Sequence, residues 1–158
     1  MHLPPLGLYI HLPWCERKCD FNSHETCGIP EQHYIRALLR DLRDDLPLLQ
    51  ERTVETLFIG GGTPSLFSAQ AIRTLLREIA ELVPLSPMLE ATMEANPGSA
   101  DADKFNAFKD AGITRLSLGI QSFDDTQLRA LGRIHSSDQA HAAIEIARIA
   151  GFNSVNLD

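Results

Sequence analysis

Five short, mostly apolar segments alternate along the chain with longer segments that carry apolar residues at helical spacing. The apolar segments span residues 8–11, 56–59, 89–94, 115–120 and 154–158. Short apolar runs of this kind are typical of strands that lie buried in a parallel sheet. Because strand and helix alternate from one end of the chain to the other, the sequence predicts an α/β fold with right-handed crossovers.

The segments between the strands predict helices, and residues suited to helix ends stand at their boundaries. Proline, serine and aspartate are common at the first positions of helices, and glycine is common just after the last turn. No linker, low-complexity segment or charge run divides the chain, so one domain over residues 1–158 is expected. The expected helices begin near Pro30, Ser68, Asp101 or Asp103, Asp124, and Ser136 or Ser137, and Gly112 and Gly151 end the third and the last.

Charge and hydropathy exclude several classes of protein. The net charge is −7, and the sequence has no basic run of the kind that neutralises nucleic-acid phosphates. No apolar stretch approaches the roughly 20 residues that cross a bilayer. The first residues lack the basic segment and apolar run of a signal peptide. We therefore expect a cytoplasmic protein without a transmembrane segment and without a nucleic-acid partner.

Unusual residues follow the apolar segments at the ends where parallel strands finish. In β/α barrels the chemistry lies at these carboxyl ends. Because the carboxyl ends of parallel strands meet at one edge of the sheet, we expect these residues to form one site. They are Trp14, Cys15 and Cys19 after the first strand, Gly60-Gly61-Gly62-Thr63-Pro64 after the second, Glu94 with Asn96 and Pro97, Gln121, and Asp158.

The glycine run is the first candidate binding loop. Three glycines permit positive φ angles and let a ligand approach the backbone closely. Their amides and carbonyls can hold a carboxylate or an ammonium group, and Thr63 adds a hydroxyl. The alternative is a tight turn from strand to helix that binds nothing, since glycine turns are common after strands.

Four polar side chains near the strand ends are further candidates: Glu94, Gln121, Arg133 and Asp158. The glutamate can accept hydrogen bonds from a ribose diol or an ammonium group, or it can form an ion pair with Arg115 or Lys109. The glutamine and the aspartate can instead cap the loop or helix that follows. The arginine can pair with a ligand carboxylate, although most arginines in such loops are solvated.

The chain has three cysteines, Cys15, Cys19 and Cys27. An odd number in a reducing compartment argues against a disulfide framework and leaves metal or cluster ligation open. A closed zinc site would need more ligands at matching spacing. A third cysteine three residues after Cys19 would indicate an iron–sulfur cluster with one open iron, but Asn22 stands there. Cys27 can be a ligand only if the loop folds back.

Taken together, the motifs resemble those of a known family. They are LYIHLPWC (8–15), FIGGGTP (58–64), MEANPG (93–98), LGIQSF (118–123), LGRIH (131–135) and NLD (156–158). In order and spacing, over the whole chain, they resemble radical S-adenosylmethionine (SAM) proteins of the oxygen-independent coproporphyrinogen III oxidase-like family. The branch of HemW-type heme chaperones is the most similar, because the first strand begins almost at Met1.

The resemblance implies an incomplete parallel (β/α) barrel that carries a [4Fe–4S] cluster and SAM. In the family, SAM chelates an open iron, and electron transfer splits its sulfonium to give a 5′-deoxyadenosyl radical. Heme or porphyrin and heme-accepting proteins are the implied partners. By motif match the cluster ligands are Cys15 and Cys19, and the SAM contacts are Tyr9, Gly61, Gly62, Thr63, Glu94, Gln121, Arg133 and Asp158. Both branches share these positions, so they do not separate a chaperone from an oxidase.

The sequence departs from the family pattern in two places. Cys19 runs directly into Asp20 and Phe21, as if three residues including the third cysteine were deleted. Two thiolates cannot hold the cluster in its usual form, so impaired cluster binding is expected. We also expect the sixth barrel unit and the carboxyl-terminal domain to be absent. The readings are a truncated heme chaperone, a coproporphyrinogen III oxidase-type enzyme that performs radical decarboxylation, and an inactive barrel fragment that binds no cofactor.

Overall fold

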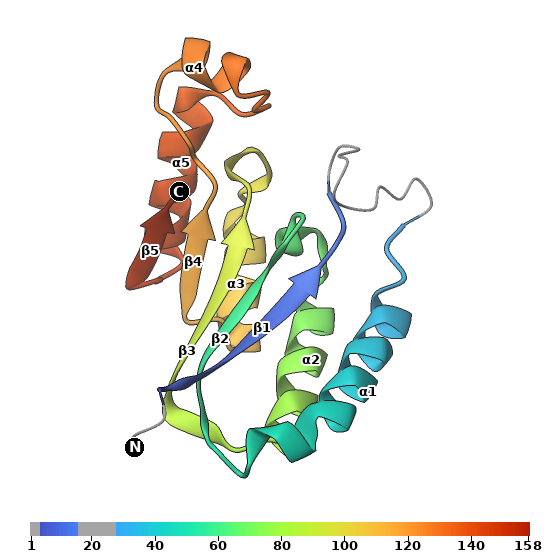
Figure 1. The fold of residues 1–158 in the computed structure, drawn as a ribbon. Helices are drawn as coiled ribbons and strands as arrows, with labels where there is room; N and C mark the ends of the chain where they lie inside the picture. The colour runs from blue at the N-terminus through green and yellow to red at the C-terminus, as the bar shows by residue number, and fades with distance from the viewer. Residues whose placement is uncertain (1–3, 16–27) are drawn as a thin grey trace.

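Five parallel strands form a single sheet whose spatial order follows the sequence. The computed structural model describes residues 4–15 and 28–158. Every neighbouring pair of strands is parallel, and Figure 1 shows all five ending on the same side of the molecule. The strands are β1 (Leu6–Leu12), β2 (Val54–Gly61), β3 (Leu85–Ala95), β4 (Arg115–Leu118) and β5 (Ser154–Leu157). The predicted α/β fold with an unclosed sheet is confirmed, and β1 and β5 are its edges.

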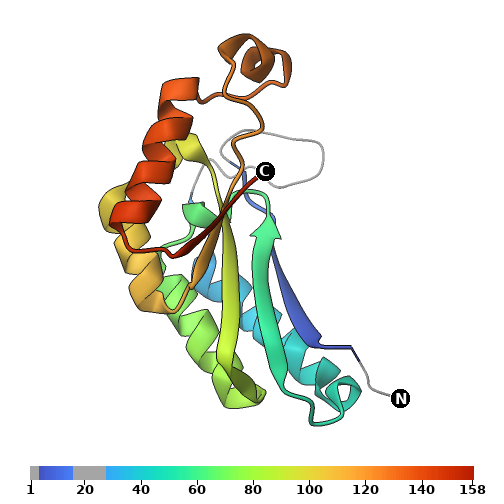
Figure 2. The same ribbon diagram turned by 90° about the vertical axis from the view of Figure 1, so that its left-hand side faces the viewer.

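The helices cover one face of this sheet, as Figure 2 shows from the side. Short 3-10 turns follow two of the strands, at Pro64–Leu66 and Pro97–Ser99. Within the described residues, no helix combines the length and the apolar character needed to cross a bilayer. The helices are α1 (Glu31–Leu49), α2 (Ala69–Leu82), α3 (Ala102–Ala111), the short α4 (Asp125–Ala130) and α5 (Ser137–Ile149).

Side-chain caps fix several of the helix ends. The Ser68 hydroxyl accepts a hydrogen bond from the third residue of α2, and Asp101 does the same for α3. Gly112 ends α3 with a φ of 115°, a conformation that costs glycine little. Ser136 and Gln139 form a reciprocal capping box at the start of α5. The structure thus selects Asp101 and Ser136 from the alternatives that the sequence leaves open.

The two faces of the sheet differ in polarity because side chains alternate along each strand. Buried apolar residues such as Leu57, Ile59 and Met93 face the helices and form the core. The opposite face, called the inner face below, carries Phe58 and Thr92, which lie directly opposite each other in the pairing of β2 with β3. The helices therefore bury one face, and the inner face carries a mixture of aromatic and polar side chains.

Strand boundaries differ from the expected ones at β3 and β4. β3 begins at Leu85 rather than at residue 89, and its first residues are not buried, so the apolar pattern does not mark them. β4 ends at Leu118 rather than at residue 120, because the amide of Ile120 turns back to the Leu118 carbonyl at 2.8 Å.

Candidate cofactor-binding site

A cavity of about 240 Å³ lies at the carboxyl ends of the strands, bounded by β2, β3, β4 and the residue after β5. Seven of the eight predicted SAM-contact residues line it, although they are dispersed over most of the sequence. Tyr9 is the one that does not. The lining residues are Gly61, Gly62, Thr63, Pro64, Glu94, Ala95, Asn96, Ser117, Gly119, Gln121, Arg133 and Asp158.

Close backbone packing explains two of the glycines in the loop after β2. Gly61 has a φ of 118°, which residues with a Cβ rarely adopt. A Cβ on Gly62 would lie less than 3.0 Å from the backbone of Trp14 and 3.0 Å from the Cys15 sulfur. The glycine loop therefore packs directly against the segment that follows β1.

Hydrogen bonds inside the protein already use the three backbone amides at residues 61–63. They donate to Glu94 Oε2 at 3.1 Å, to the Leu12 carbonyl at 2.9 Å and to the Trp14 carbonyl at 2.6 Å. The expectation that these amides hold a ligand carboxylate is thus not met by this geometry. The loop contributes the Thr63 hydroxyl to the cavity lining, and its backbone carbonyl oxygens are acceptors of the kind that suit an ammonium group.

Glu94 projects from the end of β3 on the inner face and is half-buried. Burial raises the pKa of its carboxyl, and the negative charge of Asp158 raises it further. The Gly61 amide and the positive character of His11 oppose this shift by stabilising the charged form. An ionised Glu94 would therefore gain from a cationic ligand in the cavity.

The ion pairs considered as the structural alternative for Glu94 do not form. Arg115 pairs with Glu90 instead, at 3.2 Å, on the inner face of β3 and β4. Lys109 donates a hydrogen bond to the Gly151 carbonyl. Glu94 is therefore not neutralised by either of these two basic residues.

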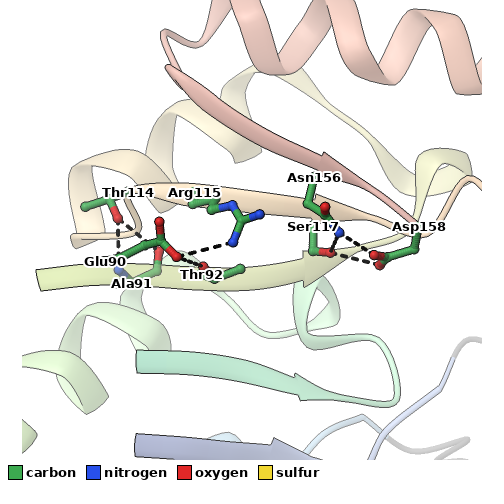
Figure 3. Close-up of polar contacts among 8 residues, drawn as sticks. All are labelled: Glu90, Ala91, Thr92, Thr114, Arg115, Ser117, Asn156 and Asp158. Atoms are coloured by element: carbon green, nitrogen blue, oxygen red, sulfur yellow. Dashed lines mark hydrogen bonds and ion pairs between the residues drawn. The ribbon is translucent and has the colours of Figure 1, made fainter. Parts of the chain in front are cut away.

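Asp158 lies beside β4, as Figure 3 shows. One oxygen of its carboxylate accepts a hydrogen bond from the Ser117 hydroxyl at 2.8 Å, and the other accepts one from the Asn156 amide. The Asn156 amide also lies 3.1 Å from the Ser117 hydroxyl oxygen. Sequence reasoning missed Ser117 and Asn156, because their shared position follows from the pairing of two strands far apart in the sequence.

Gln121 and Arg133 enter the cavity from the segment between β4 and α5. Gln121 has a φ of 67°, an uncommon conformation for a residue with a side chain, and its amide donates to the Asp158 carbonyl at 2.5 Å. The Arg133 guanidinium donates to the Gly119 carbonyl, which anchors it at the cavity wall. Gly119 leaves room for this approach, since a Cβ there would lie 2.9 Å from the guanidinium.

Tyr9 lies on the inner face of β1, outside the cavity lining. Its ring stacks on Phe58 with centroids 6.1 Å apart, and its hydroxyl is 3.1 Å from His11 Nδ1. Burial, and then the charge of Glu94, raise the pKa of Tyr9. Tyr9 is therefore a neighbour of the cavity, and a SAM contact by Tyr9 stays a prediction.

The predicted cluster ligands are only partly described. Cys15 is half-buried against the glycine loop, whereas Cys19 and Cys27 lie outside the described residues. Among residues 4–15 and 28–158, no group of three or more histidine, cysteine, aspartate or glutamate side chains could hold a metal ion. Because a [4Fe–4S] cluster is held by several thiolates, the described residues alone do not fit one.

The charges around the cavity do fit SAM. Neither Glu94 nor Asp158 takes part in any ion pair found among the described residues. The lining thus presents two carboxylates without a basic partner and one guanidinium, that of Arg133. SAM carries an ammonium, a sulfonium and a carboxylate, which match these groups in sign and number.

The fold and the cavity define a class that comparison with known proteins confirms. The chain matches the Radical SAM superfamily over residues 9–157 and belongs to that superfamily. Among curated relatives it is 51% identical to the heme chaperone HemW of Haemophilus influenzae over 164 residues, with 99% of this chain and 43% of that protein covered. It is 49% identical to HemW of Escherichia coli (99% and 42% covered), and 36% identical to HemW of Bacillus subtilis (95% and 41%).

A solved structure supports the same assignment. The coproporphyrinogen III oxidase HemN of Escherichia coli, described as a radical SAM enzyme, superposes with a TM-score of 0.83 at 29% identity. The match covers 98% of this chain and 36% of that one. The chain thus spans about two fifths of the length of the proteins it resembles. The predicted similarity to radical SAM proteins and heme chaperones is confirmed.

Proposed function

We propose that the chain binds SAM in the cavity at the carboxyl ends of its strands, as the amino-terminal part of a radical SAM heme chaperone. The observation that carries the proposal is the gathering of Glu94, Asp158 and Arg133 around one cavity beside an acceptor-rich glycine loop. A cationic amino-acid derivative with one carboxylate satisfies all of these groups. A site built only to turn the chain would not need two carboxylates without basic partners.

The ammonium, carboxylate and ribose groups of SAM each have a matching group in the lining. The ammonium group would meet the carbonyls of the glycine loop, the Thr63 hydroxyl and Glu94. The carboxylate would pair with the guanidinium of Arg133, whose planar donors match carboxylate geometry. The ribose hydroxyls would donate to Asp158 and contact Gln121. These assignments use only groups that line the cavity.

Cys15 and Cys19 are the proposed ligands of a [4Fe–4S] cluster beside the glycine loop. A bound cluster supplies the electron for cleavage of the SAM sulfonium. Because Asn22 stands where the family pattern has a third cysteine, we propose that this chain holds the cluster poorly. Heme or porphyrin as cargo, heme-accepting proteins as partners, and a cytoplasmic location are proposals for the whole protein. The sixth barrel unit and the carboxyl-terminal domain would lie outside this chain.

Two alternatives have specific support. The likeness to HemN favours a coproporphyrinogen III oxidase-type activity, since its TM-score is high over nearly the whole chain. The missing cysteine favours a barrel fragment that binds no cofactor. Heme titration and an anaerobic assay of coproporphyrinogen decarboxylation, both on the gene product that includes any downstream sequence, separate the chaperone from the oxidase.

Equilibrium dialysis with labelled SAM tests the proposal on the chain itself. Arg133→Met removes the one guanidinium among the described lining residues and is expected to weaken SAM binding at least tenfold. Arg129→Met is the matched control, because Arg129 is exposed on α4 and does not line the cavity. It is expected to change the dissociation constant less than twofold. Absence of SAM binding at millimolar concentration, or equal loss in both variants, would favour the fragment that binds no cofactor.

A further inference from the structure

The carboxylate of Asp158 is held from two sides by uncharged donors. The Ser117 hydroxyl donates to Oδ2 at 2.8 Å, and the Asn156 amide donates to Oδ1 and lies 3.1 Å from the Ser117 hydroxyl oxygen. Ser117 is 3% exposed, whereas Asp158 is exposed. The buried Ser117 hydroxyl thus orients the exposed Asp158 carboxylate, and the Asn156 amide contacts both groups (Figure 3).

Strand pairing places the three side chains together. Ser117 lies directly opposite Asn156 in the parallel pairing of β4 with β5. Asp158 follows two residues after Asn156 and therefore returns to the inner face. The arrangement depends on the register of these strands, because a slip of one residue would turn Asn156, and Asp158 after it, to the helix-covered face.

A second polar cluster on the same face makes a useful contrast. At the other end of β4, Arg115 pairs with Glu90 at 3.2 Å, and the Thr92 hydroxyl lies 3.4 Å from the same Glu90 oxygen. That carboxylate is neutralised by a guanidinium, and neither Glu90 nor Thr92 lines the cavity. Among the described residues, the donors found at the Asp158 carboxylate are the neutral Ser117 and Asn156, so no basic side chain there pairs with it.

We propose that Ser117 and Asn156 are positioning residues that hold the Asp158 carboxylate toward the ligand of the cavity. The proposal rests on SAM binding at this site and deepens it. An unsupported aspartate on the exposed end of a strand would sample several rotamers, and fixing one rotamer before binding removes that entropy cost from the binding step. A carboxylate oxygen can accept more than one hydrogen bond, so both oxygens remain able to accept from ligand hydroxyls.

SAM affinity measured across a set of variants separates positioning from simple support of the sheet. Ser117→Ala and Asn156→Leu are each expected to raise the dissociation constant about tenfold, the typical effect of losing a hydrogen bond to a charged group. Ser117→Thr keeps the hydroxyl and is expected to stay within about threefold of the parent chain. Thr92→Val is the matched control, since it removes a buried hydroxyl from the same face outside the cavity, and less than a twofold change is expected.

A double-mutant cycle with Asp158→Asn shows whether the two residues act through the aspartate. In the Asp158→Asn background, Ser117→Ala and Asn156→Leu are each expected to raise the SAM dissociation constant by less than a further twofold. The reason is that the carboxylate they orient has already been replaced. Full additivity with Asp158→Asn would overturn the proposal. So would unchanged affinity in Ser117→Ala together with a lower melting temperature, which is the result for a purely structural hydroxyl.

Crystal structures without ligand give a readout that does not depend on SAM. Asp158 is expected in one conformer in the parent chain and in a rotated or divided conformer in Ser117→Ala. An unchanged Asp158 side chain in Ser117→Ala overturns the positioning role. If the parent chain fails to bind SAM while Asp158 moves in the variant, the proposed function fails and the orienting contact stands.

Discussion

The backbone of Trp14 occupies the space where a side chain on Gly62 would begin, and a Cβ there would approach the Trp14 carbonyl to less than 3.0 Å. The same carbonyl accepts the Thr63 amide at 2.6 Å. The segment that carries Cys15 and the glycine loop are therefore locked together through backbone atoms. A displacement of one must move the other, which couples the proposed cluster side of the site to the proposed SAM side.

Gly62→Ala is expected to damage both stability and SAM binding. The new methyl group would meet backbone atoms, which cannot rotate away as a side chain can, and overpacking of this kind costs about 1–3 kcal/mol. Urea unfolding and equilibrium dialysis with labelled SAM measure the two effects. Gly98→Ala is the control, because the nearest atom to its Cβ would be 3.6 Å away, an ordinary contact. If Gly62→Ala lowered stability and SAM affinity no more than Gly98→Ala does, the close approach to Trp14 would be refuted.

Glu94→Gln is expected to separate stability from ligand binding. Burial raises the pKa of Glu94, so between the ordinary glutamate value of 4.5 and the raised value the folded state binds more protons than the unfolded state. Stability from this group is therefore greatest at low pH and falls as pH rises through that window. The amide variant keeps an acceptor for Gly61 and lacks the buried charge, so it should match the parent near pH 4 and exceed it near pH 7.

The SAM affinity of the parent chain should change with pH in the opposite direction to its stability. The ionised form of Glu94 attracts a cationic ligand, so affinity in the parent chain is expected to rise with pH across the same window. Glu94→Gln should bind SAM more weakly at pH 7 and lose most of this pH dependence. Thermal unfolding and dialysis between pH 4 and pH 8 provide both profiles. A parent chain and variant with parallel affinity profiles would exclude Glu94 as a contact of the ligand's cationic part.

The missing third cysteine predicts little or no cluster assembly by the chain as it stands. Anaerobic reconstitution followed by iron and sulfide analysis and electron paramagnetic resonance measures this directly. Asn22→Cys restores the family spacing after Cys19 and is expected to raise the iron content toward the about four atoms of a cubane. A stoichiometric cluster in the parent chain would contradict the prediction and point to Cys27, and Cys27→Ser would then abolish it.

The chain is expected to bind SAM weakly when it holds no cluster. In the family, iron anchors part of SAM, so the groups of the cavity alone would supply only a fraction of the affinity. Calorimetry with the cluster-free chain and with a reconstituted Asn22→Cys variant compares the two states. Tight SAM binding by the cluster-free chain, equal to that of the reconstituted variant, would show that the cavity needs no iron.

The sequence was sufficient to predict a parallel α/β fold and the gathering of site residues at one edge of the sheet. Parallel strands carry their polar termini to one edge, so Gly61, Glu94, Gln121 and Asp158 could be placed in one cavity without a structure. Capping residues such as Ser136 also have local causes, namely a hydroxyl and an amide within one helical turn. Local and topological rules therefore cover most of this fold.

Local and topological rules do not predict which side chains meet between segments far apart in the sequence. The register of β3 against β4 places Arg115 opposite Thr92, two residues from both Glu90 and Glu94, so its pairing with Glu90 is visible only in the structure. The use of the glycine-loop amides by internal acceptors depends on how closely Trp14 approaches. The Ser117–Asn156 pair likewise exists only after β4 and β5 have paired, so no spacing in the sequence reveals it.

His135 is expected to make the protein sensitive to mild acid. It is 3% exposed, its Nε2 lies 3.0 Å from the Ile120 carbonyl, and burial followed by the charge of Arg133 outweighs that hydrogen bond and lowers its pKa. The unfolded state therefore takes up a proton near the ordinary value of 6.5 while the folded state does not. The stability that this group contributes is present above pH 6.5 and declines as pH falls, by at most about 1.4 kcal/mol per pH unit.

His135→Gln separates this contribution from the rest of the acid response. The variant should be less stable than the parent by about 1 kcal/mol at pH 8, because a buried hydrogen bond is perturbed, and the difference should shrink between pH 6.5 and pH 5. His33→Gln, at an exposed position on α1, should leave the parent's slope intact. Urea unfolding at each pH gives the free energies. Because Ile120 directly precedes Gln121, loss of the His135 contact should also weaken SAM binding. A His135→Gln variant with full SAM affinity and an unchanged pH slope would show that His135 supports neither SAM binding nor the acid response of stability.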